Sequence, residues 1–149
     1  MDQKGLLDRL APCGLDCSRC YAFSGGDISV LSQKLGQLLG DFERYARRFS
    51  DNLPIFAHFP SFKLLLDHLA RADCLGCRRG ESCGHPLCVV KNCHKEKNVA
   101  YCFQCTEFPC EKTGFSTELK QRWIQMNCRM KEIGIEAYHE ETKKLPRYC

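Results

Sequence analysis

Residues 102–110 read CFQCTEFPC, a segment that carries three of the 13 cysteines in this 149-residue chain. Two residues separate its first two cysteines, and Cys110 closes the segment after Pro109. This C-x2-C spacing lets one tight turn aim two sulfurs at a single point, as a tetrahedral metal ion requires. Three pairs share the spacing: Cys17–Cys20, Cys74–Cys77 and Cys102–Cys105. The pattern therefore predicts loops that are held together by metal–thiolate bonds.

A disulfide framework is the competing interpretation of so many cysteines. No secretory signal is visible at the N-terminus, where Leu6 and Leu7 are followed at once by the charged Asp8 and Arg9. We therefore expect a cytoplasmic protein in a reducing compartment, where disulfides do not persist. The odd number of cysteines also leaves at least one thiol unpaired in any disulfide scheme. Both observations favour metal ligands.

The number of cysteines limits the number of metal sites. Eleven cysteines are candidate ligands: Cys13, Cys17, Cys20, Cys74, Cys77, Cys83, Cys88, Cys93, Cys102, Cys105 and Cys110. Cys128 falls within a helical pattern and Cys149 is the last residue, so we expect both to be free thiols. Eleven cysteines complete two four-sulfur sites, and His85 or His94 would allow a third, although each histidine alone is more typical of a surface. Spacing does not tell which cysteines share a site.

Residues next to the cysteines support the metal interpretation. Gly76 lies inside the Cys74–Cys77 pair, and Gly14 follows Cys13. A glycine lets the backbone turn tightly, so that amide N–H groups can point at the sulfurs. Arg78 follows Cys77 and either offsets thiolate charge or lies on a solvated loop.

The sequence predicts a mainly α fold in a single domain spanning residues 1–149, which is long enough to bury a core. It divides into a cysteine-bearing lead segment (1–26), a cysteine-free helical stretch (27–72), a cysteine-rich block (73–110) and a second helical stretch (111–149). We expect a helical hairpin and a C-terminal helix to pack around irregular metal-binding loops.

Apolar residues recur every three or four positions in both helical stretches. The first stripe comprises Ile28, Leu31, Leu35, Leu38, Phe42, Tyr45 and Phe49, and a second helix begins near Pro60. The C-terminal stripe comprises Leu119, Trp123, Ile124, Met126 and Met130, and Gly134 separates it from a short helix over 136–144. Such stripes are typical of faces that pack into a core.

Charge and motif content leave the biochemical role open. The formal net charge is +4, but each four-thiolate zinc site would add about −2. The basic balance is therefore weak evidence for nucleic acid, and the lysines over 91–97 are more typical of a solvated helix face. An iron–sulfur cluster, for electron transfer or redox sensing, would use the same thiolates. A metalloenzyme would need a general base near an open metal position, and no HExxH motif supplies one.

Taken together, the motifs resemble one prokaryotic family. The resemblance rests on APCGLDCSRC (11–20), CLGCR (74–78), CVVKNC (88–93), CFQCTEFPC (102–110) and RMKEIGIE (129–136). These segments are similar to the cysteine-rich domain of unknown function 3795 family, which is usually described as zinc-binding. The resemblance implies ten metal-ligating cysteines: Cys13, Cys17, Cys20, Cys74, Cys77, Cys88, Cys93, Cys102, Cys105 and Cys110. Cys83 falls outside the pattern, and the family brings no established activity.

We therefore predict a zinc-binding protein with two or three cysteine-ligated ions and no catalytic residues. Each structural zinc would contribute on the order of 10 kcal/mol to folding. The metals would organise a surface that binds a protein or a nucleic acid, with no role at a membrane. An iron–sulfur protein remains the alternative.

Overall fold

The computed structural model describes residues 3–79 and 87–148. The chain folds into two compact units. The cysteine unit comprises Met1–Arg19 and Cys74–Cys149, and the hairpin unit comprises Cys20–Asp73. The predictions for Cys83, His85 and Cys149 lie outside the described residues, and the single-domain boundary stays a prediction.

The cysteine unit contains four α-helices and two short 3-10 helices in its described part. They are α1 (Gln3–Arg9), η1 (Cys17–Arg19), α5 (Val90–Glu96), η3 (Cys102–Gln104), α6 (Thr117–Ile133) and α7 (Ile135–Thr142). The described residues form no β-strand, and an isolated bridge joins Leu10 to Asp16. The prediction of a mainly α fold is confirmed. Within the described ranges, no helix is both long and apolar enough to cross a membrane.

Helix α6 provides the core of the cysteine unit. Trp123 and Met130 are each 1% exposed, on the apolar face that the spacing predicts. Met130 packs with Leu6, Leu10, Tyr101 and Tyr138, whereas Trp123 packs with Ala11, Cys13, Cys88 and Val90. The helix ends at Gly134, and α7 follows directly, as predicted.

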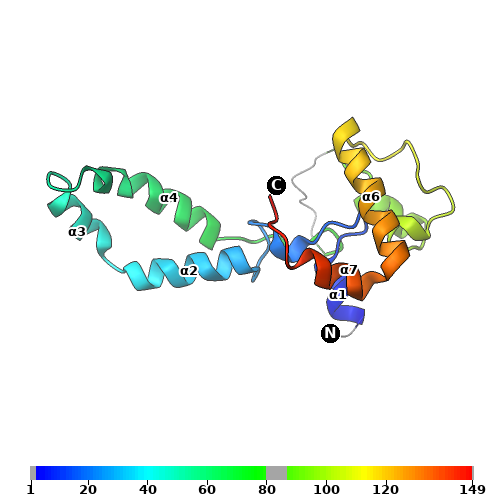
Figure 1. Ribbon diagram of the computed structural model, residues 1–149, viewed down its shortest axis with the longest axis horizontal. Coiled ribbons are helices and arrows are strands. Elements are labelled where there is room, and N and C mark those ends of the chain that lie inside the picture. Colours follow the sequence, from blue (N-terminus) through cyan, green and yellow to red (C-terminus); the bar gives the residue numbers. More distant parts are fainter. Residues whose placement is uncertain (1–2, 80–86, 149) are drawn as a thin grey trace. The chain divides into compact units, whose positions relative to one another are not determined.

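The hairpin unit is built from α2 (Asp27–Leu39), α3 (Phe42–Phe49), η2 (Pro54–His58) and α4 (Phe59–Ala70). Figure 1 shows α2 and α4 side by side, which confirms the predicted hairpin. A single helix continuing to residue 49 is wrong, because Gly40 adopts a φ of +49° and ends α2. Aromatic rings pack together where α3 meets η2 and the start of α4, and Phe42 contacts Phe56 and Phe59 there.

The apolar stripe of α2 does not form the core of the hairpin unit, which corrects the prediction. Leu31 is 63% exposed and Leu38 is 75% exposed. The buried positions on α2 are instead Ser29 and Ser32. Ser29 donates a hydrogen bond to the Ala70 carbonyl at 3.4 Å, so α2 meets α4 through small polar side chains. The larger apolar side chains are left on the outside.

Candidate metal centre

Four cysteines line one small cavity in the cysteine unit. They are Cys93 on α5, Cys102 on η3, and Cys105 and Cys110 in the segment that follows. The cavity volume is about 30 Å³, enough for one ion or one to two water molecules. Its remaining walls include Val90, Phe108 and Trp123, which are apolar. We call this arrangement the four-cysteine pocket.

The thiols of this pocket influence one another electrostatically. Burial, with repulsion from the other three cysteines of the pocket, raises the pKa of Cys102 to about 11, and the Trp123 side chain partly opposes this. Burial also raises the pKa of Cys93, and repulsion from Cys110 and Cys105 adds to the rise. The cause is that several thiolates in one apolar space repel each other and lose hydration. A cation among the sulfurs would reverse both effects, because metal ions bind the deprotonated form.

His94 also lines the four-cysteine pocket, although its spacing alone suggests a surface residue. The side chain is buried, and its Nδ1 lies 3.3 Å from the Val99 carbonyl oxygen, to which it donates. Its Nε2 is buried without a hydrogen-bond partner among the described residues. Burial lowers the pKa of His94, so the ring is neutral at pH 7. A neutral imidazole held by a backbone carbonyl is the arrangement that metal-ligating histidines adopt.

The side chains line the pocket without converging on one point. Among residues 3–79 and 87–148, no group of three or more Cys, His, Asp or Glu side chains has the geometry of a metal site. None of the eleven described cysteines forms a disulfide. The pocket thus has the donor set for a metal, and its sulfurs would have to draw together around an ion.

A second group of cysteines surrounds Cys13. Cys13 and Cys88 are buried in the cluster that contains Trp123, and Cys17 and Cys77 pack against it. Burial raises the pKa of Cys13, with further repulsion from Cys17, Cys102 and Cys88. Cys13 and Cys17, which precede the hairpin unit in the chain, therefore meet Cys77 and Cys88, which follow it, within one unit.

The glycines beside the cysteines have different roles. Gly76 adopts a φ of +86° and donates its N–H to the Cys74 Sγ at 3.4 Å, which confirms the predicted turn. Gly14 instead donates to the Ala11 carbonyl at 2.9 Å, so an N–H directed at sulfur is wrong there. A Cβ on Gly14 would lie 2.9 Å from the Met130 Cε. Gly14 therefore allows the cysteine loop to approach α6 closely.

Asn127 on α6 ties two cysteine segments together. Its side chain is fully buried, and Nδ2 donates to the Cys13 carbonyl at 2.8 Å. Its Oδ1 accepts from the Phe103 backbone N–H at 3.0 Å. One amide group thus fixes the backbone beside Cys13 and beside Cys102.

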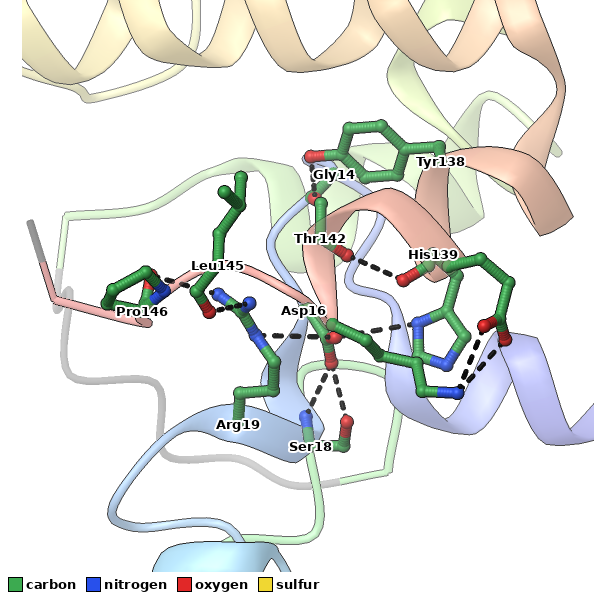
Figure 2. A network of polar contacts seen from close by, with 11 residues as sticks. Gly14, Asp16, Ser18, Arg19, Tyr138, His139, Thr142, Leu145 and Pro146 are labelled. Carbon is green, nitrogen blue, oxygen red and sulfur yellow. Dashed lines mark hydrogen bonds and ion pairs between the residues drawn. The ribbon is translucent and has the colours of Figure 1, made fainter.

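Figure 2 shows how the loop that carries Cys13 and Cys17 is fastened to α7. Asp16 Oδ1 accepts from the backbone N–H and the hydroxyl of Ser18, at 3.1 and 2.6 Å. Asp16 Oδ2 lies 3.4 Å from His139 Nδ1 and 3.6 Å from Arg19 Nε. Tyr138 donates its hydroxyl to the Gly14 carbonyl at 2.9 Å. The carboxylate is almost completely buried and anchors this loop.

The buried position of His139 predicts a loss of stability in mild acid. Burial lowers the pKa of His139 below the usual value of 6.5, and Asp16 only partly opposes this. As pH falls below about 6.5, His139 binds a proton in the unfolded chain but remains neutral in the folded chain. The free energy of unfolding therefore falls. A single group contributes at most about 1.4 kcal/mol per pH unit. Urea unfolding between pH 7.5 and 5.5 should show a shallower fall for His139→Gln than for the unmodified protein. Parallel pH profiles would contradict this role, and comparison at each pH cancels the protonation of the cysteines.

Arg78 is part of the scaffold of the cysteine unit. Its guanidinium donates to the carbonyls of Leu10 at 3.2 Å and Ala100 at 2.6 Å. It also lies over the Tyr101 ring, 4.9 Å from the centroid. A solvated loop position is therefore wrong for Arg78.

The remaining predicted ligands and thiols are distributed as follows. Cys20 is half-buried at the start of the hairpin unit. Cys74 is half-buried at the point where the chain re-enters the cysteine unit. Cys128 is exposed on α6, within the helix that the pattern predicts.

Comparison with known proteins identifies the family. No curated protein and no solved structure matches the chain. The family model described as "Protein of unknown function (DUF3795)" matches residues 9–115. This range includes all ten cysteines that the resemblance implies as ligands, whereas the segment 129–136 lies beyond it. Because the match covers more than half of the sequence, the chain belongs to the DUF3795 family of proteins of unknown function.

Proposed function

We propose that this chain is a zinc-binding protein in which Cys93, Cys102, Cys105 and Cys110 supply the ligands of one structural ion. The observation that carries the proposal is the presence of these four cysteines around one small apolar cavity. Four thiolates form the closed tetrahedral shell of a structural zinc site. Zinc bound there would join α5, η3 and the segment that ends at Cys110.

The residues fit such an ion in charge as well as in type. The raised pKa values of Cys93 and Cys102 arise from burial and from neighbouring sulfurs. Deprotonating these buried, neighbouring thiols costs free energy, and a divalent cation that binds their thiolates offsets this cost. His94 lines the same cavity, and its buried Nε2 has no hydrogen-bond partner among the described residues.

An iron–sulfur cluster is the second candidate, favoured by one observation. The cysteines of the pocket surround the cavity without converging in the described part of the chain. A cluster holds its cysteine sulfurs farther apart than a single ion does, because the cluster's own iron and sulfide lie between them. The small volume of about 30 Å³ supports the single ion, and we therefore place zinc first.

We further propose that the metal organises a binding surface in a cytoplasmic protein without an enzymatic role. A protein partner is favoured over a nucleic acid because several basic side chains are already neutralised. Lys97 pairs with Glu107, and Arg79 pairs with Asp8 at 2.7 Å. Binding that depends steeply on salt would favour nucleic acid instead.

Metal analysis of anaerobically purified protein tests the metal proposal. Elemental analysis gives zinc and iron per chain, and a visible spectrum detects a cluster. The variant Cys93→Ser/Cys110→Ser should hold one zinc fewer per chain than the unmodified protein. Cys128→Ser is the matched control, because Cys128 is exposed and lies outside the pocket.

Each result has a definite meaning. Colourless protein that loses one zinc in the double variant supports the proposal. Iron with acid-labile sulfide, lost in the same variant, replaces zinc with the cluster. Metal-free protein from zinc-supplied cells, or equal zinc in all three proteins, overturns the assignment of the pocket.

A further inference from the structure

The hairpin unit exposes large apolar side chains on both of its long helices. On α2, Leu31, Leu35 and Leu38 are 63%, 41% and 75% exposed. On α4, Phe62 and Leu65 are 43% and 59% exposed. We call these five residues the leucine face. Exposed apolar residues are common singly, but a contiguous group on one side of a protein marks an interaction site.

Helix geometry places the five residues on one side of the hairpin. A helix turns about 100° per residue, so the three leucines of α2 form one row, displaced by roughly 120° from the buried Ser29 and Ser32. On α4, Phe62 and Leu65 are rotated about the helix axis from the buried Leu66 by roughly 40° and 100°. The direction of this rotation, viewed along each helix from its N-terminus, is the same as on α2. Because α2 and α4 are antiparallel neighbours (Figure 1), equal senses of displacement bring both rows to the same side.

The hairpin unit has little core of its own to compensate for this exposure. Its buried apolar residues are Ala46, Phe59 and Leu66. The contact between α2 and α4 includes polar bonds, such as that from Gln33 Nε2 to the Ala70 carbonyl at 2.8 Å. A two-helix layer with so few buried residues needs further apolar contact for stability.

The size of the leucine face suits a protein interface. From their exposed fractions, the five side chains present about 500 Å² of surface, near the upper end for the largest patch on a monomer. Each helix is about 20 Å long. Two such helices side by side offer about 800 Å² with their flanking atoms, which is one partner's share of a standard interface.

Composition indicates what covers this face. The uncharged residues Ile28, Ser61 and Leu69 continue the two rows. The face therefore has no charged side chains that would select a partner surface of opposite charge. An aliphatic face of this kind is complementary to itself. Two antiparallel hairpins packed face to face form a four-helix arrangement, in which each apolar row gains a neighbour.

We propose that the leucine face binds the leucine face of a second copy of this chain, giving a two-fold symmetric dimer. The dimer is independent of the zinc proposal, because the face contains no cysteine. The partner contributes the same five residues, so every contact occurs twice. The hairpin unit thereby obtains the apolar packing that it lacks within one chain.

Sedimentation equilibrium of the full chain tests the dimer. The unmodified protein should be a dimer at 20 µM, and Leu31→Glu/Leu35→Glu should raise the dimer dissociation constant at least 100-fold. The matched control is Val30→Glu/Leu64→Glu. These side chains are 48% and 75% exposed, and they lie roughly 110° and 130° around their helices from the two rows of the leucine face. The control should remain a dimer, and metal content should be the same in all three proteins.

A second measurement guards against a variant that fails to fold. A photo-reactive residue placed at position 38 should cross-link two full-length chains, whereas one at position 30 should not. A monomeric unmodified protein at 20 µM overturns the proposal. A dimer that survives the leucine substitutions, or one that both variant pairs weaken equally, also overturns it.

Discussion

The variant Cys102→Ser/Cys105→Ser is expected to lose several kcal/mol of unfolding free energy together with its pocket metal. A structural zinc contributes on the order of 10 kcal/mol, and the variant removes two of the four ligands that we propose for it. Trp123 is the single tryptophan and lines the pocket, so its fluorescence follows unfolding at the site itself. Urea titration should give a lower midpoint for the double variant, or no folded baseline at all.

Two comparisons separate metal loss from simple damage to the core. Cys128→Ser should unfold at the same urea concentration as the unmodified protein, because Cys128 is exposed. A chelator added to the unmodified protein should lower the midpoint and have no further effect on the double variant. Retained resistance to proteolysis over 88–110 after complete metal removal would contradict a structural ion.

Local signals predict most of the helices in this chain. Gly134 separates α6 from α7. A glycine that ends a helix is a local signal, so this boundary can be predicted without knowing the tertiary fold. The face of α2 is a different problem, since periodicity shows that an apolar row exists but not what covers it. Ser29 and Ser32 face α4, and this choice depends on the partner helix. Apolar rows therefore predict helices more reliably than they predict cores.

The candidate site follows the same division between local and tertiary information. Spacing identifies Cys102 and Cys105 as a pair, and the turn at Gly76 also follows from a local motif. Spacing cannot add Cys93 to that pair, because α5 brings it to the pocket through the tertiary fold. Spacing names His94 only as one of two histidines that could complete a third site, and for the same reason it cannot place His94 at this pocket. Its burial and its bond to Val99 exist only in the folded chain.

Asn127→Ala is expected to lower the unfolding free energy by about 3–5 kcal/mol, the second large effect. The substitution leaves the Cys13 carbonyl and the Phe103 N–H without the partners that they have at 2.8 and 3.0 Å. A stranded buried polar group costs about 1–3 kcal/mol, and the empty volume adds to this. Urea unfolding followed by fluorescence and by circular dichroism measures the loss. Gln121→Ala is the control, since Gln121 is exposed on the same helix.

The same variant distinguishes a positioning role from a purely local one. Asn127 fixes the backbone beside Cys13 and beside Cys102, which belong to the two groups of cysteines. Its loss should therefore weaken zinc affinity at the pocket as well as stability, although Asn127 is not a ligand. Competition with a chromogenic chelator measures that affinity under conditions where the variant is still folded. An unchanged affinity together with the full loss of stability would show that Asn127 supports the core without positioning the cysteines. A drop in both would show that α6 couples the packing of the unit to the geometry of its sulfurs.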